Sequence, residues 1–351
     1  MLLIQASLVM SAVCTLLQLF PIGRYFGSGL PVILGVSFAY VPSMQAIASS
    51  GGGVAAIAGA MIVGGVVAII VGIFVKKIRL LFPPVITGTV VFTIGLFLYP
   101  TAINYMAGGT ANTAEAIAAS GASESLIYGS WQNWLVAALT LIAVIVLNHF
   151  AKGLCKLASI LIGMLFGYVV AAVFFNMVSF SSVGGMDRDP TDRELQGGII
   201  AHGASNILTA LFGGLPTATY SQNVGIVTTN KVINRTVFAL TGVFLLLAGV
   251  SPKFAAILTT IPQCVLGGAT VTVFSTIAMT GMKLIASQEL SARNTTIVGL
   301  SAALGVGISQ AAGSLSQFPD SFTMIFGKSP VVVATIMAVL LNLVLPREKK
   351  S

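Results

Sequence analysis

The stretch GLPTATYSQNVG, residues 214–225, decides the fold, because it interrupts long apolar runs with hydroxyl and amide side chains. Pro216 and Gly225 flank this stretch and allow the backbone to leave helical geometry, which frees N–H and C=O groups for a ligand. The amides of Gln222 and Asn223 offer paired donors and acceptors, which match the edge of a flat heterocycle. The stretch is therefore a binding site, a re-entrant turn or an ordinary loop outside the membrane.

The composition of the chain indicates a membrane protein. Of its 351 residues 56% are hydrophobic and 7% are charged, whereas soluble domains contain about 25% charged residues. The net charge of +8 suits basic cytoplasmic loops. Lysines and arginines are scattered between apolar runs, which argues against nucleic-acid binding, and the three cysteines show neither metal spacing nor a disulfide framework.

Apolar runs of spanning length recur along the whole chain, and we count about twelve of them. The weakest is 217–233, which is short and polar. Glycine, with 38 residues, is abundant inside these runs, as close helix packing in lipid favours. The predicted membrane segments are residues 2–20, 29–50, 53–75, 84–106, 132–150, 158–180, 197–215, 217–233, 235–251, 262–286, 295–313 and 330–346.

Two pairs of motifs recur in the same order and predict two structural repeats. GLPVILGVSFAYVP begins at Gly29, and GLPTATYSQNVG begins at Gly214. Further along, PPVITGTV begins at Pro83 and PQCVLGGA at Pro262, each with a glycine five residues after its first proline. Polar segments interrupted by Gly and Pro at corresponding positions are typical of a transporter binding site.

The basic residues give two accounts of the topology, which disagree over the loop 181–196. Counted from the N-terminus, the basic residues of 76–79 and 152–156 are cytoplasmic, and the loop lies outside. Counted back from the basic residues of 347–350 at a cytoplasmic C-terminus, the same loop lies inside. Either 217–233 does not span, or an odd number of spans is absent at that loop.

The ionisable residues argue against an enzyme. All nine Asp and Glu residues fall in predicted loops or the C-terminal tail, and four of them lie close together in SSVGGMDRDPTDRELQGG, residues 181–198, as solvated loop residues. His149 and His202 stand at the ends of predicted segments, where an interfacial role is favoured over a catalytic one. No Ser/His/Asp set, metal-spaced cluster or phosphate loop occurs in the sequence, so we expect neither a catalytic residue nor a cofactor.

The motif SFAYVP in the first repeat carries Phe38 and Tyr40 just before a proline. Aromatic faces can stack on a planar ring, as they do on nucleic-acid bases. The alternative is that both aromatics pack against neighbouring helices.

QNVGIVTTNK, residues 222–231, resembles the signature of the nucleobase–ascorbate transporters, also called nucleobase–cation symporters. Gln222, Asn223, Gly225 and Lys231 fit that signature, whereas Asn230 stands at its Thr position. The resemblance covers nearly the whole chain. It extends to GSGLPVILGVSFAYVPSM (27–44), FPPVITGTVVFTIG (82–95) and DPTDRELQGGIIAHG (189–203).

The resemblance implies two inverted seven-span repeats, divided into a core and a gate domain. The third and tenth spans of that family are broken by short strands that meet at mid-membrane and hold the base. Carried over by motif, Gln222 would hydrogen-bond the base, with Asn223 beside it. The implied substrate-binding residues are Phe38, Ala39, Tyr40, Ser221, Gln222 and Asn223, and the implied structural-motif residues are Pro216, Gly225 and Lys231.

The sequence departs from the family at two segments. The first span, with its Gln-His pair, has no counterpart, because the chain opens in what resembles the second span. The eighth span, with an essential Glu, is expected between NMVSFSSVG and DRDPTDREL, where no apolar run exists. The family treats 217–233 as membrane-embedded, which favours the missing-span account of the topology. The carboxylate expected to couple protons is therefore absent from the predicted spans.

The sequence thus predicts an all-α polytopic membrane protein with an inverted-repeat architecture and two short strands in broken helices. The core domain would combine residues 1–75 with 181–251. The gate domain would combine residues 76–180 with 252–351.

The predicted function is secondary active import of a purine nucleobase such as xanthine or urate, in symport with a proton or a sodium ion. Gln222 favours an oxidised purine, since uracil-type members carry Glu there. The expected partners are a nucleobase and the lipid bilayer of a bacterial plasma membrane, with a cytoplasmic C-terminus, a possible homodimer and no nucleic acid. The alternatives are a uracil permease of the same family, an anion carrier on the same fold, and a non-transporting truncated remnant.

Overall fold

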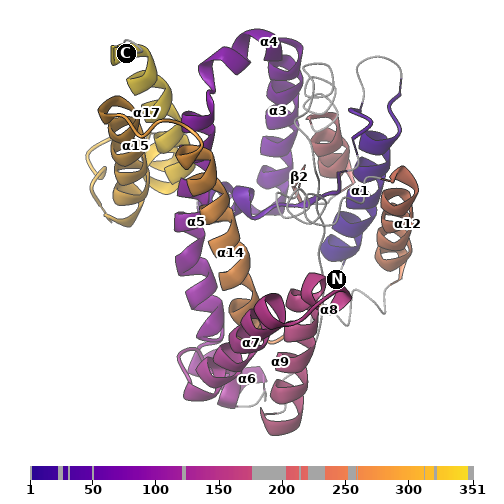
Figure 1. Cartoon of the computed structure of the whole chain (residues 1–351). Coiled ribbons are helices and arrows are strands. Elements are labelled where there is room, and N and C mark those ends of the chain that lie inside the picture. The colour runs from indigo at the N-terminus through magenta and orange to yellow at the C-terminus, as the bar shows by residue number, and fades with distance from the viewer. Residues whose placement is uncertain are drawn as a thin grey trace.

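The computed structural model describes most of the chain as apolar helices around one short pair of strands (Figure 1). The described residues are 2–22, 27–30, 32–49, 51–120, 124–175, 203–212, 215–219, 234–251, 258, 260–311, 313–319 and 322–346.

The first repeat begins with a helix, a strand and a second helix, followed by longer helices. Its elements are α1 (Leu2–Leu19), β1 (Leu34–Val36), η1 (Phe38–Tyr40), α2 (Val41–Ser49), α3 (Gly53–Ile73), α4 (Val75–Ile78), η2 (Arg79–Leu81), α5 (Pro84–Met106), α6 (Ala114–Ser120), η3 (Glu124–Leu126), α7 (Trp131–Phe150), α8 (Leu154–Leu157) and α9 (Ser159–Phe175).

The second repeat follows the same order of helix, strand and helices. Residues 203–211 form a helix. The later elements are β2 (Thr217–Thr219), α12 (Arg235–Val250), α14 (Gln263–Ala286), α15 (Ala292–Gln310), the π-helix η4 (Thr323–Gly327) and α17 (Pro330–Val344).

Residues typical of helix starts begin several of these helices. Pro83 and Pro262 occupy the N-cap positions of α5 and α14. The side chains of Ser130, Asn234 and Ser291 each accept a hydrogen bond from a backbone N–H in the first turn of α7, α12 and α15. Such caps satisfy N–H groups that the helix itself leaves unpaired.

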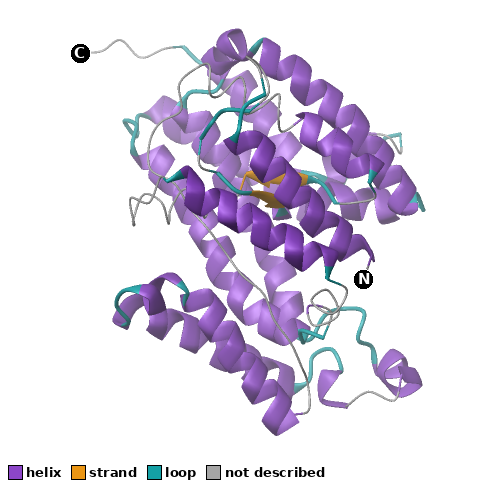
Figure 2. Ribbon diagram, turned by 90° about the vertical axis from the view of Figure 1, so that its right-hand side faces the viewer, coloured by secondary structure: helices purple, strands orange, loops and turns teal. Residues whose placement is uncertain are grey.

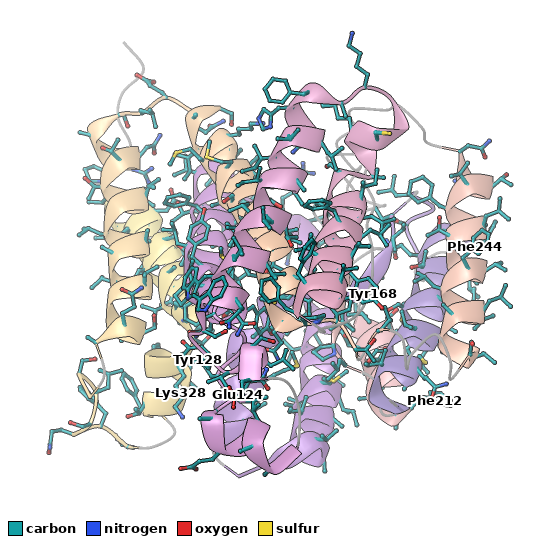
Figure 3. The ribbon with its side chains drawn as sticks, turned by 90° about the horizontal axis from the view of Figure 1, so that it is seen from below. Glu124, Tyr128, Tyr168, Phe212, Phe244 and Lys328 are labelled. Atoms are coloured by element: carbon teal, nitrogen blue, oxygen red, sulfur yellow. The ribbon has the colours of Figure 1, made fainter. Side chains whose placement is uncertain are left out.

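The helices follow the predicted membrane segments closely. Among the described residues α3, α5, α7 and α14 are long and apolar enough to cross a bilayer, and α1, α9, α12 and α17 carry shorter apolar stretches. Phe212 and Phe244 are 68% and 70% exposed and lie toward the outer edge of the bundle (Figure 3). Apolar side chains on the outside of apolar helices are expected where lipid is the solvent.

The predicted segment 29–50 differs from a single spanning helix, because it is divided into β1, η1 and α2. Gly35 inside β1 and Pro42 in the first turn of α2 fit the break, since glycine weakens a helix and proline is tolerated only in its first turn. The short elements α4, η2, α6 and η4 lie between or beside the predicted segments and were not expected. Residues 181–196, over which the topology accounts disagree, lie outside the described residues.

Equivalent elements of the two repeats pair with one another. α5 packs along α14 in the centre of the molecule (Figure 1). A Cβ on Gly88 would meet the carbonyl of Gly281 at 2.9 Å, and one on Gly267 would clash with the backbone N of Met106. Such close backbone approach is how glycine-rich membrane helices pack.

The helices that flank the strands also pair across the repeats, so that the helix before one strand packs against a helix that follows the other strand. α1, which precedes β1, packs against α12, which follows β2. The 203–211 helix, which precedes β2, meets α3, which follows α2: a Cβ on Gly203 would lie 2.5 Å from the carbonyl of Gly65. This exchange between repeats confirms the internal duplication that the sequence motifs predict.

Candidate functional site

The two strands meet in the interior of the helix bundle (Figure 2). β1 and β2 are antiparallel, with Leu34 opposite Thr219 and Val36 opposite Thr217. The pairing continues beyond the strands, because the Ser37 N–H donates to the Pro216 carbonyl at 3.3 Å. The predicted meeting of two broken segments is therefore present, and Pro216 lies at the junction.

The backbone groups on the outer edges of this two-stranded ribbon do not bond to the partner strand. In an antiparallel pair, residues alternate between positions that bond to the partner strand and positions whose N–H and C=O point away from it. The Ser37–Pro216 bond places Leu34 and Thr217 at positions of the second kind. Unpaired backbone groups cannot be left in a membrane interior, so each edge needs another partner.

A hydroxyl on α1 satisfies the edge of β1. Thr15 Oγ1 accepts a hydrogen bond from the Leu34 N–H at 3.0 Å and donates to the Leu34 carbonyl at 3.2 Å. Thr15 is fully buried. One hydroxyl thus pairs with both outward-facing backbone groups of Leu34.

An amide on the 203–211 helix satisfies the edge of β2. Asn206 Oδ1 accepts a hydrogen bond from the Thr217 N–H at 2.8 Å, and Asn206 Nδ2 donates to the Thr217 carbonyl at 3.2 Å. Asn206 is buried and Thr217 fully so. Thr15 and Asn206 therefore play similar parts in the two repeats, each on the helix that precedes the strand.

Phe38, a predicted substrate-binding residue, packs against α14 beside α5. Its ring packs edge to face on Phe274 of α14, with centroids 5.0 Å apart and an interplanar angle of 79°. Phe274 is fully buried, beside Leu98 and Ala102 of α5. Phe38 thus connects the strand region to the α5–α14 pair.

Tyr40 has different surroundings from Phe38, although only Ala39 separates them in η1. Tyr40 lines a cavity of about 170 Å³, which is enclosed largely by apolar side chains of α2 and α3. The polar residues at this cavity are Tyr40, Ser43 and Asn206, and Pro216 also lines it. Phe38 and Tyr40 therefore do not share this cavity, which is smaller than the ~300–1,000 Å³ typical of ligand pockets.

The second half of the predicted site lies outside the described residues. This applies to Ser221, Gln222, Asn223, Gly225 and Lys231. Their roles stay predictions. Thr219, the last residue of β2, directly precedes Tyr220 and Ser221 in the chain, so the ribbon fixes the point from which that half begins.

The polar surroundings of the ribbon were missed by sequence reasoning. Thr15 follows Ser7 and Ser11 at four-residue intervals along α1, and Asn206 lies in a stretch that also contains Ser205 and Thr209, all in predicted spans. Cys14 Sγ lies 3.8 Å from Thr209 Oγ1, so α1 and the 203–211 helix are also in polar contact. The signal was present as polar residues inside apolar runs on the helices that precede the two motifs.

Within the part of the chain that the structure describes, no group of three or more His, Cys, Asp or Glu side chains could hold a metal ion. Glu115 lies in α6, Glu124 in η3, and Glu289 between α14 and α15, all outside the predicted spans. The described side chains that bond to the edges of the ribbon, Thr15 and Asn206, are uncharged donors and acceptors.

Comparison with known proteins points to one class of carrier. A family model described as a permease family matches residues 2–191 and, separately, residues 183–313. The uric acid permease PucJ of Bacillus subtilis is 34% identical, over 99% of this chain and 86% of its own. The xanthine permease of Bacillus subtilis is 32% identical, over 97% of this chain and 85% of its own.

The alignments also show that this chain lacks internal residues that its relatives have. The alignment with PucJ extends over 397 positions, whereas this chain has 351 residues. The two matches of the family model meet at residues 183–191. This is the region where the sequence predicts a missing span.

A solved structure supports the architecture. The transmembrane domain of a cyanobacterial bicarbonate transporter, BicA, superposes with a TM-score of 0.52, covering 97% of this chain and 96% of that one. At 13% identity this likeness concerns the fold alone.

Proposed function

The chain belongs to the permease family, and on that premise we propose that it carries an oxidised purine nucleobase, xanthine or urate, across the membrane. The observation that carries the proposal is the antiparallel pairing of β1 with β2. The pairing brings β1, which precedes Phe38 and Tyr40 in the chain, alongside β2, which precedes Gln222.

The relatives support a purine as the substrate class, since two of them are named as uric acid and xanthine permeases. The Gln222–Asn223 pair supports it independently, because an uncharged amide can donate to and accept from the edge of a neutral purine. Phe38 would stack on the base once its ring leaves Phe274, and Tyr40 would supply a hydroxyl.

The proposed mechanism is alternating access between two groups of helices. α1, α2, α3, the 203–211 helix, the ribbon and α12 would form the core, within residues 1–75 and 181–251. The helices α5, α7, α9, α14, α15 and α17 would form the gate, within 76–180 and 252–351. The contact of Phe38 with Phe274 lies between these groups and would change as one moves against the other.

Import would be coupled to a proton or a sodium ion, in a bacterial plasma membrane with the C-terminus in the cytoplasm, by a monomer or a homodimer. No Asp or Glu occurs in the predicted spans. Proton coupling would then need a group other than a membrane carboxylate, so the dependence of uptake on pH and on sodium distinguishes the two ions.

A second candidate, a chain that binds a purine without transporting it, is favoured by the internal residues missing relative to PucJ. A uracil permease is the alternative substrate assignment. Uptake and binding of radiolabelled xanthine, urate and uracil separate these possibilities. We expect uptake of xanthine or urate by cells that express the chain and lack their own purine carriers, and binding of the same purine to the purified protein.

The role of Gln222 is tested by Gln222→Glu, which we expect to weaken xanthine binding and to favour uracil. The matched control is Gln288→Glu, the same change at an exposed loop residue between α14 and α15. Binding without uptake would identify the non-transporting chain. Absence of both would refute the proposed function.

A further inference from the structure

We propose that Asn206 is a positioning residue for purine binding, which holds Tyr40 of the first repeat in place relative to strand β2 of the second. This inference rests on the proposed function. Asn206 itself lies on the 203–211 helix, outside both motifs from which the site was predicted.

The contacts of Asn206 with β2 use both ends of its amide. Oδ1 accepts from the Thr217 N–H at 2.8 Å and from Thr217 Oγ1 at 3.3 Å, and Nδ2 donates to the Thr217 carbonyl at 3.2 Å. Asn206 is only 6% exposed. Its amide therefore fixes the first residue of β2 in both directions along the backbone.

The second partner of Asn206 belongs to the other repeat. Tyr40, which follows β1, lines the same cavity as Asn206, with its side chain within hydrogen-bonding reach of the Asn206 amide. A primary amide has two N–H donors, so Nδ2 can serve the Thr217 carbonyl with one and the Tyr40 hydroxyl with the other. One buried side chain thus contacts a predicted substrate-binding residue and the strand that leads to Gln222.

Thr15 provides a contact that only supports a strand, on the helix that precedes β1. Its hydroxyl pairs with the N–H and C=O of Leu34, as Asn206 pairs with those of Thr217. Thr15 is not among the residues that line the cavity of Tyr40. Thr15→Val therefore removes the support of one strand and leaves the Tyr40–Asn206 contact in place.

Loss of the Asn206 amide should affect the affinity for the purine as well as the stability of the fold. Thr217 is the first residue of β2, so loss of the amide removes the partner of its N–H and C=O and frees the start of that strand. Tyr40 loses its amide partner in the same step. A variant without the amide should bind the purine more weakly than its loss of stability explains.

The test measures binding of radiolabelled xanthine and urate to the purified full chain in lipid nanodiscs, together with the thermal midpoint of each variant. Asn206→Leu removes the amide at similar volume, and Asn206→Asp keeps an acceptor for the Thr217 N–H. We expect Asn206→Leu to weaken binding about tenfold, the effect of losing about 1.4 kcal/mol. The affinity of Asn206→Asp for the purine should lie between that of Asn206→Leu and that of the unchanged protein. Arg293→Met, at the distant α15–α17 contact, should lower the midpoint and leave affinity unchanged.

The decisive comparison is a double-variant cycle with Tyr40→Phe. If Asn206 acts through Tyr40, the double variant Asn206→Leu/Tyr40→Phe binds the purine no more weakly than Asn206→Leu alone. In the control pair, the separate losses of affinity caused by Thr15→Val and Tyr40→Phe multiply in the double variant. If Asn206→Leu does not fold, the same cycle is measured with Asn206→Asp. Independent effects of Asn206 and Tyr40 on binding would overturn the inference. An unchanged protein that binds neither purine would instead refute the proposed function, and the inference with it.

Discussion

The crossing of α5 and α14 offers a sharp test of the fold, because glycines bring the two backbones into direct contact. A Cβ on Gly95 would lie 2.5 Å from the backbone N of Ala278 and 2.6 Å from its Cα. Carbon atoms in contact prefer about 3.5–4.0 Å, so Gly95→Ala forces the helices about 1 Å apart at this point. The atoms it meets belong largely to the backbone, which cannot rotate away.

The expected cost follows from two opposing contributions. Overpacking a core costs about 1–3 kcal/mol, while alanine gains about 1 kcal/mol over glycine in helix propensity. Contact with backbone atoms places the cost at or above the upper end, so we expect a net loss of about 2 kcal/mol. At about 2–4 °C per kcal/mol, the apparent thermal midpoint should fall by about 4–8 °C.

The assay is thermal unfolding of the detergent-purified protein, followed by the loss of monodisperse protein on a sizing column. Gly299→Ala on α15 is the matched control, since a Cβ there meets nothing within 4 Å. We expect its midpoint to be unchanged or slightly raised. Equal midpoints for Gly95→Ala and Gly299→Ala would refute the close packing of α5 on α14.

Two further predictions concern topology and the α15–α17 contact. Cys155 is exposed whereas Cys14 and Cys264 are buried. A membrane-permeant maleimide should therefore label only Cys155 in intact cells, and an impermeant one should label none if the α8 region is cytoplasmic; labelling by the impermeant reagent would contradict that orientation. Arg293 Nη2 donates to the Asn342 carbonyl at 2.6 Å, at the C-terminal end of α17, so Arg293→Met should lower stability by about 1.5 kcal/mol. An unchanged thermal midpoint for this variant would show that the contact contributes nothing.

The sequence predicts the helices and the internal duplication well, and the structure shows the physical reason. The prolines of PPVITGTV and PQCVLGGA, Pro83 and Pro262, occupy the N-cap positions of equivalent helices. The glycines five residues later, Gly88 and Gly267, both lie at the crossing of those helices. The two motifs resemble one another because each provides a proline at the start of its helix and a glycine where the two helix backbones approach closely.

The polar supports of the ribbon could not be predicted from local patterns. Thr15 is 19 residues from Leu34, and Asn206 is 11 residues from Thr217. Neither separation is a helical or strand period. The need for such supports follows from the physics of an isolated ribbon in a membrane interior, but their identity depends on how α1 and the 203–211 helix pack beside the strands.

The difference between the two supports is informative because the repeats otherwise correspond. A single hydroxyl is enough to satisfy the N–H and C=O of Leu34. In the second repeat the helix that precedes the strand supplies a larger side chain, Asn206, which bonds to the N–H and C=O of Thr217 and also reaches Tyr40. Satisfying the edge of β2 does not require that additional donor. The two repeats therefore differ at Asn206, the residue that connects them. Asn206 lines the cavity that Tyr40 also lines, and does not lie at the lipid-facing surface.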